Sequence, residues 1–254
     1  MHVKVLGCSA GISEGLRTTS FKLGDHALLD CGTGVGDLSL PELLAIDTVF
    51  LTHSHLDHSG FLPFLADAHA SHGGPGITVH ALPYVTALLR QRLFDGPLWP
   101  DYTRQPEPDH PYIRFQALDF ATAIPCGDGT VRALPAQHSV PAVGFLLEGP
   151  KAALAFSGDS GPCPAFWAAA AASPKLAHVI VENTFRNQQQ TAAERSGHMI
   201  ANWLPPLAAG IDRPYELWIS HLEPGHEAAL MAEVQALPLA TPARPLQRGM
   251  MFVL

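Results

Sequence analysis

The stretch FLTHSHLDHSGFLPFL, residues 50–65, carries three histidines and an aspartate within six consecutive positions. These four residues are His53, His55, Asp57 and His58. The apolar run directly before them, DTVFL, has the length of a strand. Residues two apart in an extended chain face the same side, so the first two histidines would project together. A turn after Leu56 would bring the aspartate and the last histidine to a second, adjacent position.

This motif points to metal binding rather than to a chance cluster in a histidine-rich chain. Independent placement of the residues would produce the pattern in about one chain in five hundred. Imidazole and carboxylate groups suit zinc and other divalent ions, and two neighbouring positions that share a water make a two-metal centre. We therefore predict a pair of divalent ions, with zinc as the first choice and manganese or iron as alternatives.

The length fits one large α/β domain or at most two small ones, and we expect a single domain over residues 1–254. The protein should be compact, because 47% of its residues are hydrophobic and only 15% are charged. A net charge of −8 with 15 Lys and Arg gives no basic footprint for a long nucleic acid. It leaves room for a small anionic substrate, since bound metal would dominate the local field. No apolar run approaches the roughly 20 residues of a spanning helix, so we expect no membrane partner.

The start of the chain, MHVKVLG, lacks the charged and apolar regions of a signal peptide, so we expect a cytoplasmic protein. The four cysteines are far apart with no CxxC pair, and we expect reduced, mostly buried thiols. They are Cys8, Cys31, Cys126 and Cys163.

Strand-like and helix-like stretches alternate along the chain, which predicts two sheets covered by helices on their outer faces. The expected strands are residues 2–7, 20–24, 26–32, 47–51, 77–82, 113–118, 130–136, 142–149, 152–158, 177–183 and 215–221. The expected helices are residues 35–46, 60–70, 83–94, 191–204 and 227–237. Residues 95–112, which are rich in proline, are expected to be irregular.

Three further residues are candidates to complete a two-metal site, because one loop cannot supply enough ligands. His138 follows TVRALPAQ, Asp159 follows ALAFSG, and His221 follows YELWIS. Each lies where an expected strand passes into a loop, which is where functional residues concentrate. An ordinary surface role for each histidine is the alternative.

Six motifs follow one another along the chain: LGCSAG, LLDCG, THSHLDH, HSVPAVGF, SGDSGP and ISHLEP. They occur in the order of the metallo-β-lactamase superfamily, which the chain resembles from Val5 to about Pro224. The resemblance implies an α/β (α+β) fold, a four-layered αββα sandwich with the metals at one edge. It also implies the ligand sets. One metal would be held by His53, His55 and His138, the other by Asp57, His58 and His221, with Asp159 bridging.

Within that superfamily, two phosphodiesterase branches are most similar to the chain. HSHLDHSGFLPFL resembles the signature of class II cyclic-nucleotide phosphodiesterases, although Ser59 occupies a usually aliphatic position. LFDGPLWPDYT, residues 93–103, is similar to the Phe-Asn … Trp-Pro segment of that family, with Asp95 in place of the asparagine. This branch implies hydrolysis of a 3',5'-cyclic nucleotide, cAMP or cGMP, and is our first choice.

The second branch is tRNase Z. VENTF, residues 181–185, resembles its His-Glu-Ala-Thr-Phe segment with Val181 replacing the leading histidine, and ERSGHM resembles the segment whose histidine, here His198, lies near the scissile phosphate. The chain has no Gly/Lys-rich extension able to bind tRNA, and its net negative charge disfavours RNA binding.

A glyoxalase II-like thioesterase is a further alternative. A β-lactamase fits poorly, because Asp159 stands where a cysteine is typical, and a non-catalytic protein would have eroded ligands.

Both phosphodiesterase branches imply attack of a metal-bridging hydroxide on phosphorus, in line with the leaving sugar oxygen. The catalytic candidates are Asp57, which would orient the nucleophile, His198, which would donate a proton to the leaving oxygen, and Glu182, which would orient His198. A helix-surface histidine and an ordinary strand-end acid are the alternatives for His198 and Glu182.

In residues 95–112, the side chains that could stack on or steer a base are Trp99, Tyr102 and Arg104. We also expect a homodimer, on the frequency of two-fold assemblies.

Overall fold

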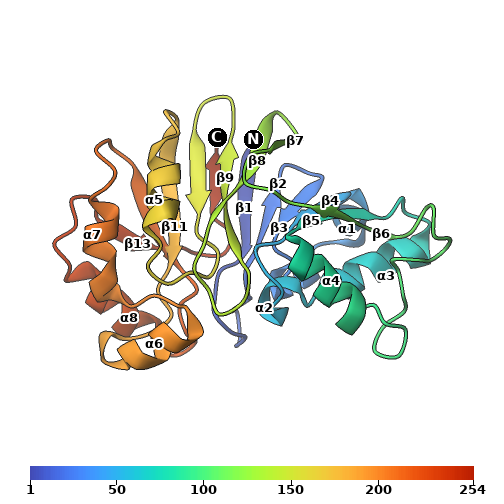
Figure 1. Ribbon diagram of the computed structural model, residues 1–254, viewed down its shortest axis with the longest axis horizontal. Coiled ribbons are helices and arrows are strands. Elements are labelled where there is room, and N and C mark those ends of the chain that lie inside the picture. The colour runs from blue at the N-terminus through green and yellow to red at the C-terminus, as the bar shows by residue number, and fades with distance from the viewer.

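Two seven-stranded sheets packed face to face form the centre of the computed structural model, which describes residues 1–254 (Figure 1). The N-terminal sheet has the strand order β14-β1-β2-β3-β4-β5-β6. Its strands are β1 (His2–Gly7), β2 (Ser20–Leu23), β3 (Ala27–Leu29), β4 (Thr48–Phe50), β5 (Ile77–Ala81), β6 (Ile113–Ala117) and β14 (Met251–Val253).

The C-terminal sheet has the order β13-β12-β11-β10-β9-β8-β7. Its strands are β7 (Ala123–Cys126), β8 (Gly129–Pro135), β9 (Val143–Glu148), β10 (Ala153–Phe156), β11 (Leu176–Glu182), β12 (Glu216–Ser220) and β13 (Ala243–Pro245). The chain therefore builds one sheet from each half, and only β14 returns to the first sheet, where it pairs antiparallel with β1.

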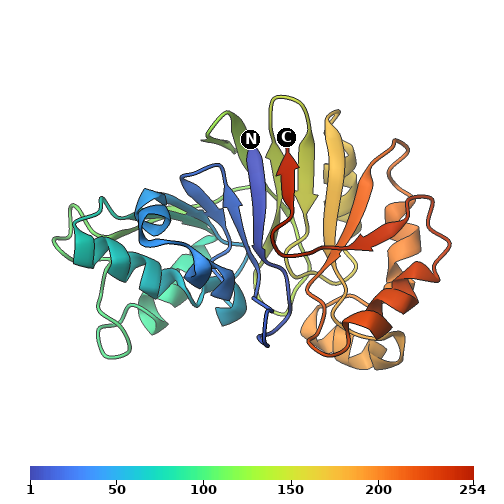
Figure 2. The same ribbon diagram turned by 180° about the vertical axis from the view of Figure 1, so that it is seen from behind.

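Helices cover the outer face of each sheet, and Figure 2 shows the same four layers from behind. The elements beside the N-terminal sheet are η1 (Thr33–Asp37), α1 (Leu40–Ala45), α2 (Leu56–Ser59), α3 (Leu62–His72) and α4 (Pro83–Arg92). Those beside the C-terminal sheet are α5 (Pro164–Ala171), η2 (Asn187–Gln189), α6 (Gln190–Ser196), η3 (Ala201–Trp203), α7 (Leu204–Ala208) and α8 (Glu227–Gln235). The predicted αββα sandwich is confirmed.

Alternation of side chains along the strands divides the buried apolar residues into three layers. In β4, Val49 packs under the helices of its own half, whereas the next residue, Phe50, packs between the sheets. In β11, Val179 and Val181 face α5, α7 and α8, and Ile180 faces the other sheet. Strands β3, β9 and β10 are buried on both faces, which explains their nearly continuous apolar runs.

Three expected elements differ in the structure, and helix α5 is an addition to the expected ones. The expected helix 191–204 is broken, because Gly197 ends α6 in a left-handed conformation (φ +70°). The expected helix 35–46 splits into η1 and α1, since Ser39 caps α1 through Glu42. A short helix, α2, replaces the expected turn after Leu56. Helix α5 was not predicted, because PAFWAAAA has no polar face to give a helical period.

One edge of the sandwich collects the ends of many strands. β3 to β6 are mutually parallel, as are β10 to β13, so their carboxyl ends meet at a common edge in each sheet. Open sheets with parallel strands place ligand sites at that edge. None of the helices has the length and apolar character that a membrane crossing requires.

Candidate metal centre

The predicted metal-binding residues come together at this edge, each just beyond the carboxyl end of a strand. The THSHLDH motif follows β4, His138 follows β8, Asp159 follows β10, and His221 follows β12 directly. Residues that are up to 168 positions apart in sequence, His53 and His221, thus lie at one site because parallel strands share an edge.

Two groups of donor atoms form there. In the first group, the ligand atoms all lie within 4.8 Å of one another; its members are His53, His55, His138 and Asp159. His55 Nδ1 lies 3.2 Å from His138 Nε2, and His53 Nε2 lies 3.7 Å from Asp159 Oδ2. As predicted for an extended segment, His53 and His55 project to the same side, with ring centroids 4.7 Å apart.

The second group shares Asp159 with the first and has the same 4.8 Å limit; its members are Asp57, His58, Asp159 and His221. His58 Nε2 lies 3.2 Å from Asp159 Oδ1. His221 Nε2 lies 3.2 Å from Asp57 Oδ2 and 3.4 Å from Asp159 Oδ2. The Asp159 carboxylate therefore lies between the groups, as the bridging residue of a dinuclear site would.

The spacing fits a tetrahedral ion, because metal–ligand bonds of about 2.0–2.2 Å separate the ligand atoms by about 3.3–3.6 Å. Buried His53 Nε2 has no hydrogen-bond partner and faces the centre of the first group, which is where an ion would meet it. Burial lowers the pKa of His53, His55 and His138, which favours the neutral imidazoles that bind a metal. The side chains of both groups thus fit divalent ions.

The field of the second group favours positive charge. Burial opposes ionisation of Asp159, but the nearby His221 and His58 outweigh it and hold the pKa of its carboxyl well below the usual range. Burial likewise opposes a charged His58, but Asp159 and Asp30 outweigh it and raise the pKa of His58 well above its usual value. A divalent ion would take the place of that proton.

Outer contacts orient three of the imidazoles. His58 Nδ1 donates to Asp30 Oδ2 (2.7 Å), His138 Nδ1 to the Gly197 carbonyl (3.0 Å) and His221 Nδ1 to Thr184 Oγ1 (2.9 Å). Such contacts fix which ring nitrogen faces a metal. The sequence reasoning missed Asp30 and Thr184 as parts of the site, although the LLDCG and VENTF motifs that contain them had been noticed.

Two non-glycine residues have positive φ, and both belong to this centre: Asp30 (+56°) and His221 (+55°). That conformation is unfavourable for residues with a Cβ, and it persists where surrounding contacts hold it. The Asp30 carboxylate is held by the backbone N–H and hydroxyl of Thr52 at 2.8–3.0 Å. The His221 N–H donates to the Cys8 carbonyl at 2.7 Å. The fold therefore fixes these two side chains at a cost in backbone energy.

We expect Asp30→Asn to weaken metal binding about 10- to 100-fold. The amide keeps the volume of the carboxylate but removes the charge that orients the proton on His58 Nδ1. Competition with a chelator measures the affinity. Asp67→Asn is the matched control, because Asp67 also accepts a short hydrogen bond, 2.6 Å from Tyr102 Oη, but lies in α3 away from the centre. Unchanged affinity in Asp30→Asn would contradict this role.

The predicted pair Glu182 and His198 also lies at the centre. His198 Nδ1 donates to Glu182 Oε1 at 2.7 Å, and the His198 ring stacks on that of His221 at 5.4 Å. Gly197 ends α6, so His198 lies in the loop after it, and the alternative of a helix-surface histidine is wrong. Burial opposes the charged imidazole, but Glu182 outweighs it and raises the pKa of His198 to about 9.

Glu182 is fully engaged by donors. The carboxylate, 1% exposed, accepts from Ser160 N (2.9 Å), Thr184 Oγ1 (2.6 Å) and Met199 N (3.2 Å) as well as from His198. Although Glu182, His198 and His221 lie close enough to hold an ion, each Glu182 oxygen already accepts two hydrogen bonds. The carboxylate is therefore an anchor for His198 and, through Thr184, for His221.

The Pro-rich residues 95–112 differ from expectation at Tyr102. That ring is buried in the core of the N-terminal half and its hydroxyl donates to Asp67 of α3, so it is not available to stack on a base. Trp99 is half-buried and packs on Phe64 of α3, with ring centroids 5.0 Å apart. Arg104 is exposed, and a role in steering a substrate stays a prediction.

Comparison with known proteins agrees with the fold. Residues 26–236 match the profile of the Beta-lactamase superfamily domain. Over 162 residues the chain is 30% identical to Ribonuclease Z of Bradyrhizobium diazoefficiens, covering 57% of this chain and 49% of that one. The chain spans about half, or less, of the length of the curated relatives it matches.

Two solved structures cover nearly the whole chain. The metallo-beta-lactamase fold protein YhfI from Bacillus subtilis superposes with a TM-score of 0.78 at 19% identity, over 99% of both chains. Unliganded yeast PDE1 superposes with a TM-score of 0.80 at 14% identity, over 100% of this chain and 99% of that one. Both likenesses concern the fold.

Proposed function

The chain belongs to the beta-lactamase superfamily, and from that premise we propose that it is a dinuclear metal-dependent phosphodiesterase that hydrolyses a small phosphodiester, a 3',5'-cyclic nucleotide such as cAMP or cGMP. The observation that carries this proposal is the pair of donor groups joined by Asp159 beside the Glu182–His198 pair. Two divalent ions bound there would activate water as a nucleophile and offset the charge that grows on a phosphate.

The residues around the ions have separate tasks in this reaction. Asp57 has one oxygen near His221 and is partly exposed, so it can orient the attacking water as well as bind a metal. His198 carries a proton on a ring that Glu182 holds in place, and it donates that proton to the departing sugar oxygen. Without that proton the sugar oxygen would have to depart as an alkoxide, which is a poor leaving group.

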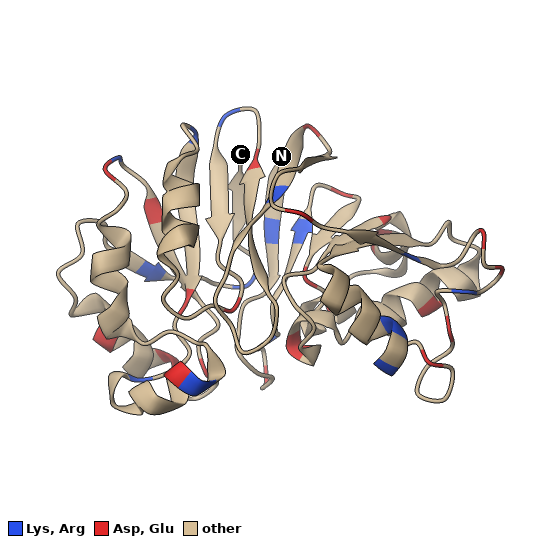
Figure 3. Ribbon diagram, in the orientation of Figure 1, with Lys and Arg blue, Asp and Glu red and all other residues tan.

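A processing ribonuclease is the second candidate, because the Bradyrhizobium relative is named Ribonuclease Z and the Glu182–His198 pair lies in the motifs resembling that family. The charge distribution favours the smaller substrate. Lys and Arg number 15 against 23 Asp and Glu, and they are dispersed over both halves of the fold (Figure 3). RNA binding draws its affinity from clustered positive charge.

The experiment is an assay of the zinc- or manganese-loaded protein against cAMP, cGMP, a precursor tRNA and a thioester. We expect turnover of the cyclic nucleotides that a chelator abolishes and added metal restores. Turnover of the tRNA alone would replace this proposal with the ribonuclease, and turnover of the thioester alone would replace both with a thioesterase like glyoxalase II.

A further inference from the structure

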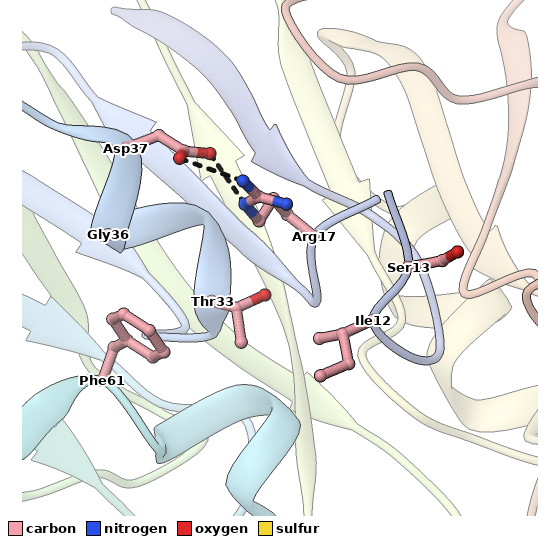
Figure 4. A pocket seen from close by; sticks show the side chains of 7 residues that line it. All are labelled: Ile12, Ser13, Arg17, Thr33, Gly36, Asp37 and Phe61. Carbon is pink, nitrogen blue, oxygen red and sulfur yellow. Dashed lines mark hydrogen bonds and ion pairs between the residues drawn. The ribbon is translucent and has the colours of Figure 1, made fainter. Parts of the chain in front are cut away.

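An open pocket of about 520 Å³ lies between the loop joining β1 to β2, helix η1 and the start of α3 (Figure 4). Its volume is within the range of about 300–1,000 Å³ that is usual for small-molecule sites. The lining side chains include Ile12 and Phe61, which point toward each other with Thr33 between them. The pocket thus has two apolar walls and a small polar floor.

The walls are tied to the second group of donor atoms. The β1–β2 loop bonds to the segment of His221, since Cys8 O accepts from His221 N (2.7 Å) and Ala10 N donates to Leu222 O (3.1 Å). The segment before η1 bonds to the segment of His58, because Cys31 N donates to the His58 carbonyl (2.6 Å). These bonds place two walls of the pocket beside the segments that carry His58 and His221 of the second group.

The polar side of the pocket is an ion pair. The one positive side chain in its lining is Arg17, whose Nε lies 2.9 Å and Nη2 3.3 Å from the two Asp37 oxygens. That bidentate pair holds the planar guanidinium in one orientation, and Asp37 also pairs with Arg248 at 2.6 Å. Ile12 is 71% exposed, so covering it with a ligand removes apolar surface from water. An uncharged, flat, largely apolar group fits these walls.

We propose that this pocket seats the nucleobase of the substrate, with Ile12 and Phe61 as the apolar walls that contact it, while the phosphate lies at the metal centre; this deepens the proposed function and rests on it. The base is placed against apolar side chains and the guanidinium face of Arg17 rather than held by a buried charge. Stacking and burial of this kind tolerate more than one base.

The test is calorimetric binding of 5'-AMP and of inorganic phosphate to the zinc-loaded protein. We expect the wild-type protein to bind 5'-AMP more tightly than phosphate, and Ile12→Asp to weaken 5'-AMP binding about tenfold with no change for phosphate. The matched control is Val253→Asp, because Val253 is also exposed (55%) but lies in β14 near the C-terminus, at the opposite edge of the sandwich (Figure 1).

Two results would overturn the assignment: equal binding of 5'-AMP and phosphate by the wild-type protein, or unchanged 5'-AMP affinity in Ile12→Asp. Both are read without turnover, so they are distinct from failure of the proposed function. A protein that hydrolyses cyclic nucleotides but shows either result keeps the function and loses this pocket. One that shows the expected binding contrast but cleaves no phosphodiester keeps the pocket and loses the function.

Discussion

Asp159→Asn is expected to lower the turnover of a phosphodiester by a factor of about 10³ or more. It should also lower the metal content to fewer than two ions per chain. The Asp159 oxygens lie 3.2 Å from His58 Nε2, 3.4 Å from His221 Nε2 and 3.7 Å from His53 Nε2, so both donor groups lose a negative ligand together. The amide has the same shape but carries no charge.

Metal analysis and steady-state kinetics on the same preparation measure this effect. The control is Asp119→Asn, because Asp119 is an exposed aspartate in the turn between β6 and β7, where it caps local backbone N–H groups. It should keep both metal and turnover. An Asp159→Asn protein that still binds two ions and keeps most of its turnover would show that Asp159 does not bridge the two groups.

His198→Ala is expected to lower turnover about 10²- to 10⁴-fold for a substrate with a sugar leaving group, while the metal content stays the same. His198 is in neither of the two groups that Asp159 joins, and it acts through its own proton. A p-nitrophenyl phosphodiester should be much less affected, because nitrophenolate departs without a proton. Free imidazole should restore part of the lost activity.

The comparison of the two leaving groups distinguishes a catalytic role from a structural one. His72→Ala is the control, since His72 is exposed at the end of α3 and bonds only to the carbonyl of Ala68. An equal loss of turnover with both leaving groups would assign His198 to the architecture of the centre. Loss of metal would make it a ligand.

The sequence was sufficient to predict which side chains meet at the centre. The H-x-H-x-D-H spacing needs only one strand and one bend, and His138, Asp159 and His221 each follow an apolar run that becomes a strand. Parallel strands then bring these residues to one edge whatever their separation along the chain. The pairing of Glu182 with His198 came from the resemblance to a known family, because no helical or strand periodicity in the sequence reveals it.

Two features that the sequence did not predict depend on long-range contacts, and a third depends on one glycine. Asp30 orients His58 from 28 residues away, and its positive φ is visible only in three dimensions. Tyr102 appears in a polar, Pro-rich stretch that favours an exposed loop, yet a hydrogen bond to Asp67 and the apolar core draw it inward. The break after α6 follows from the single Gly197, whose neighbours His198 and Met199 otherwise continue a helical pattern.

Ser59 shows how a local departure from the family pattern is accommodated. Its hydroxyl is buried, at a position that is usually aliphatic in the phosphodiesterase signature that the motif resembles, but it donates to the carbonyls of Ser54 (3.1 Å) and His55 (2.9 Å). The polar atom is therefore satisfied by the backbone of the candidate ligand loop itself. Ser59 thus stiffens the segment that carries His53, His55, Asp57 and His58.

The most direct test of the central claim, that seven side chains hold two ions, is the metal content of the purified protein after loading with zinc or manganese and removal of excess ion. We predict two ions per chain, and loss of both on prolonged chelation should leave the strands intact by circular dichroism. A content near zero after loading would contradict the two-metal centre, and with it the chemistry assigned to Asp57, Asp159 and His198.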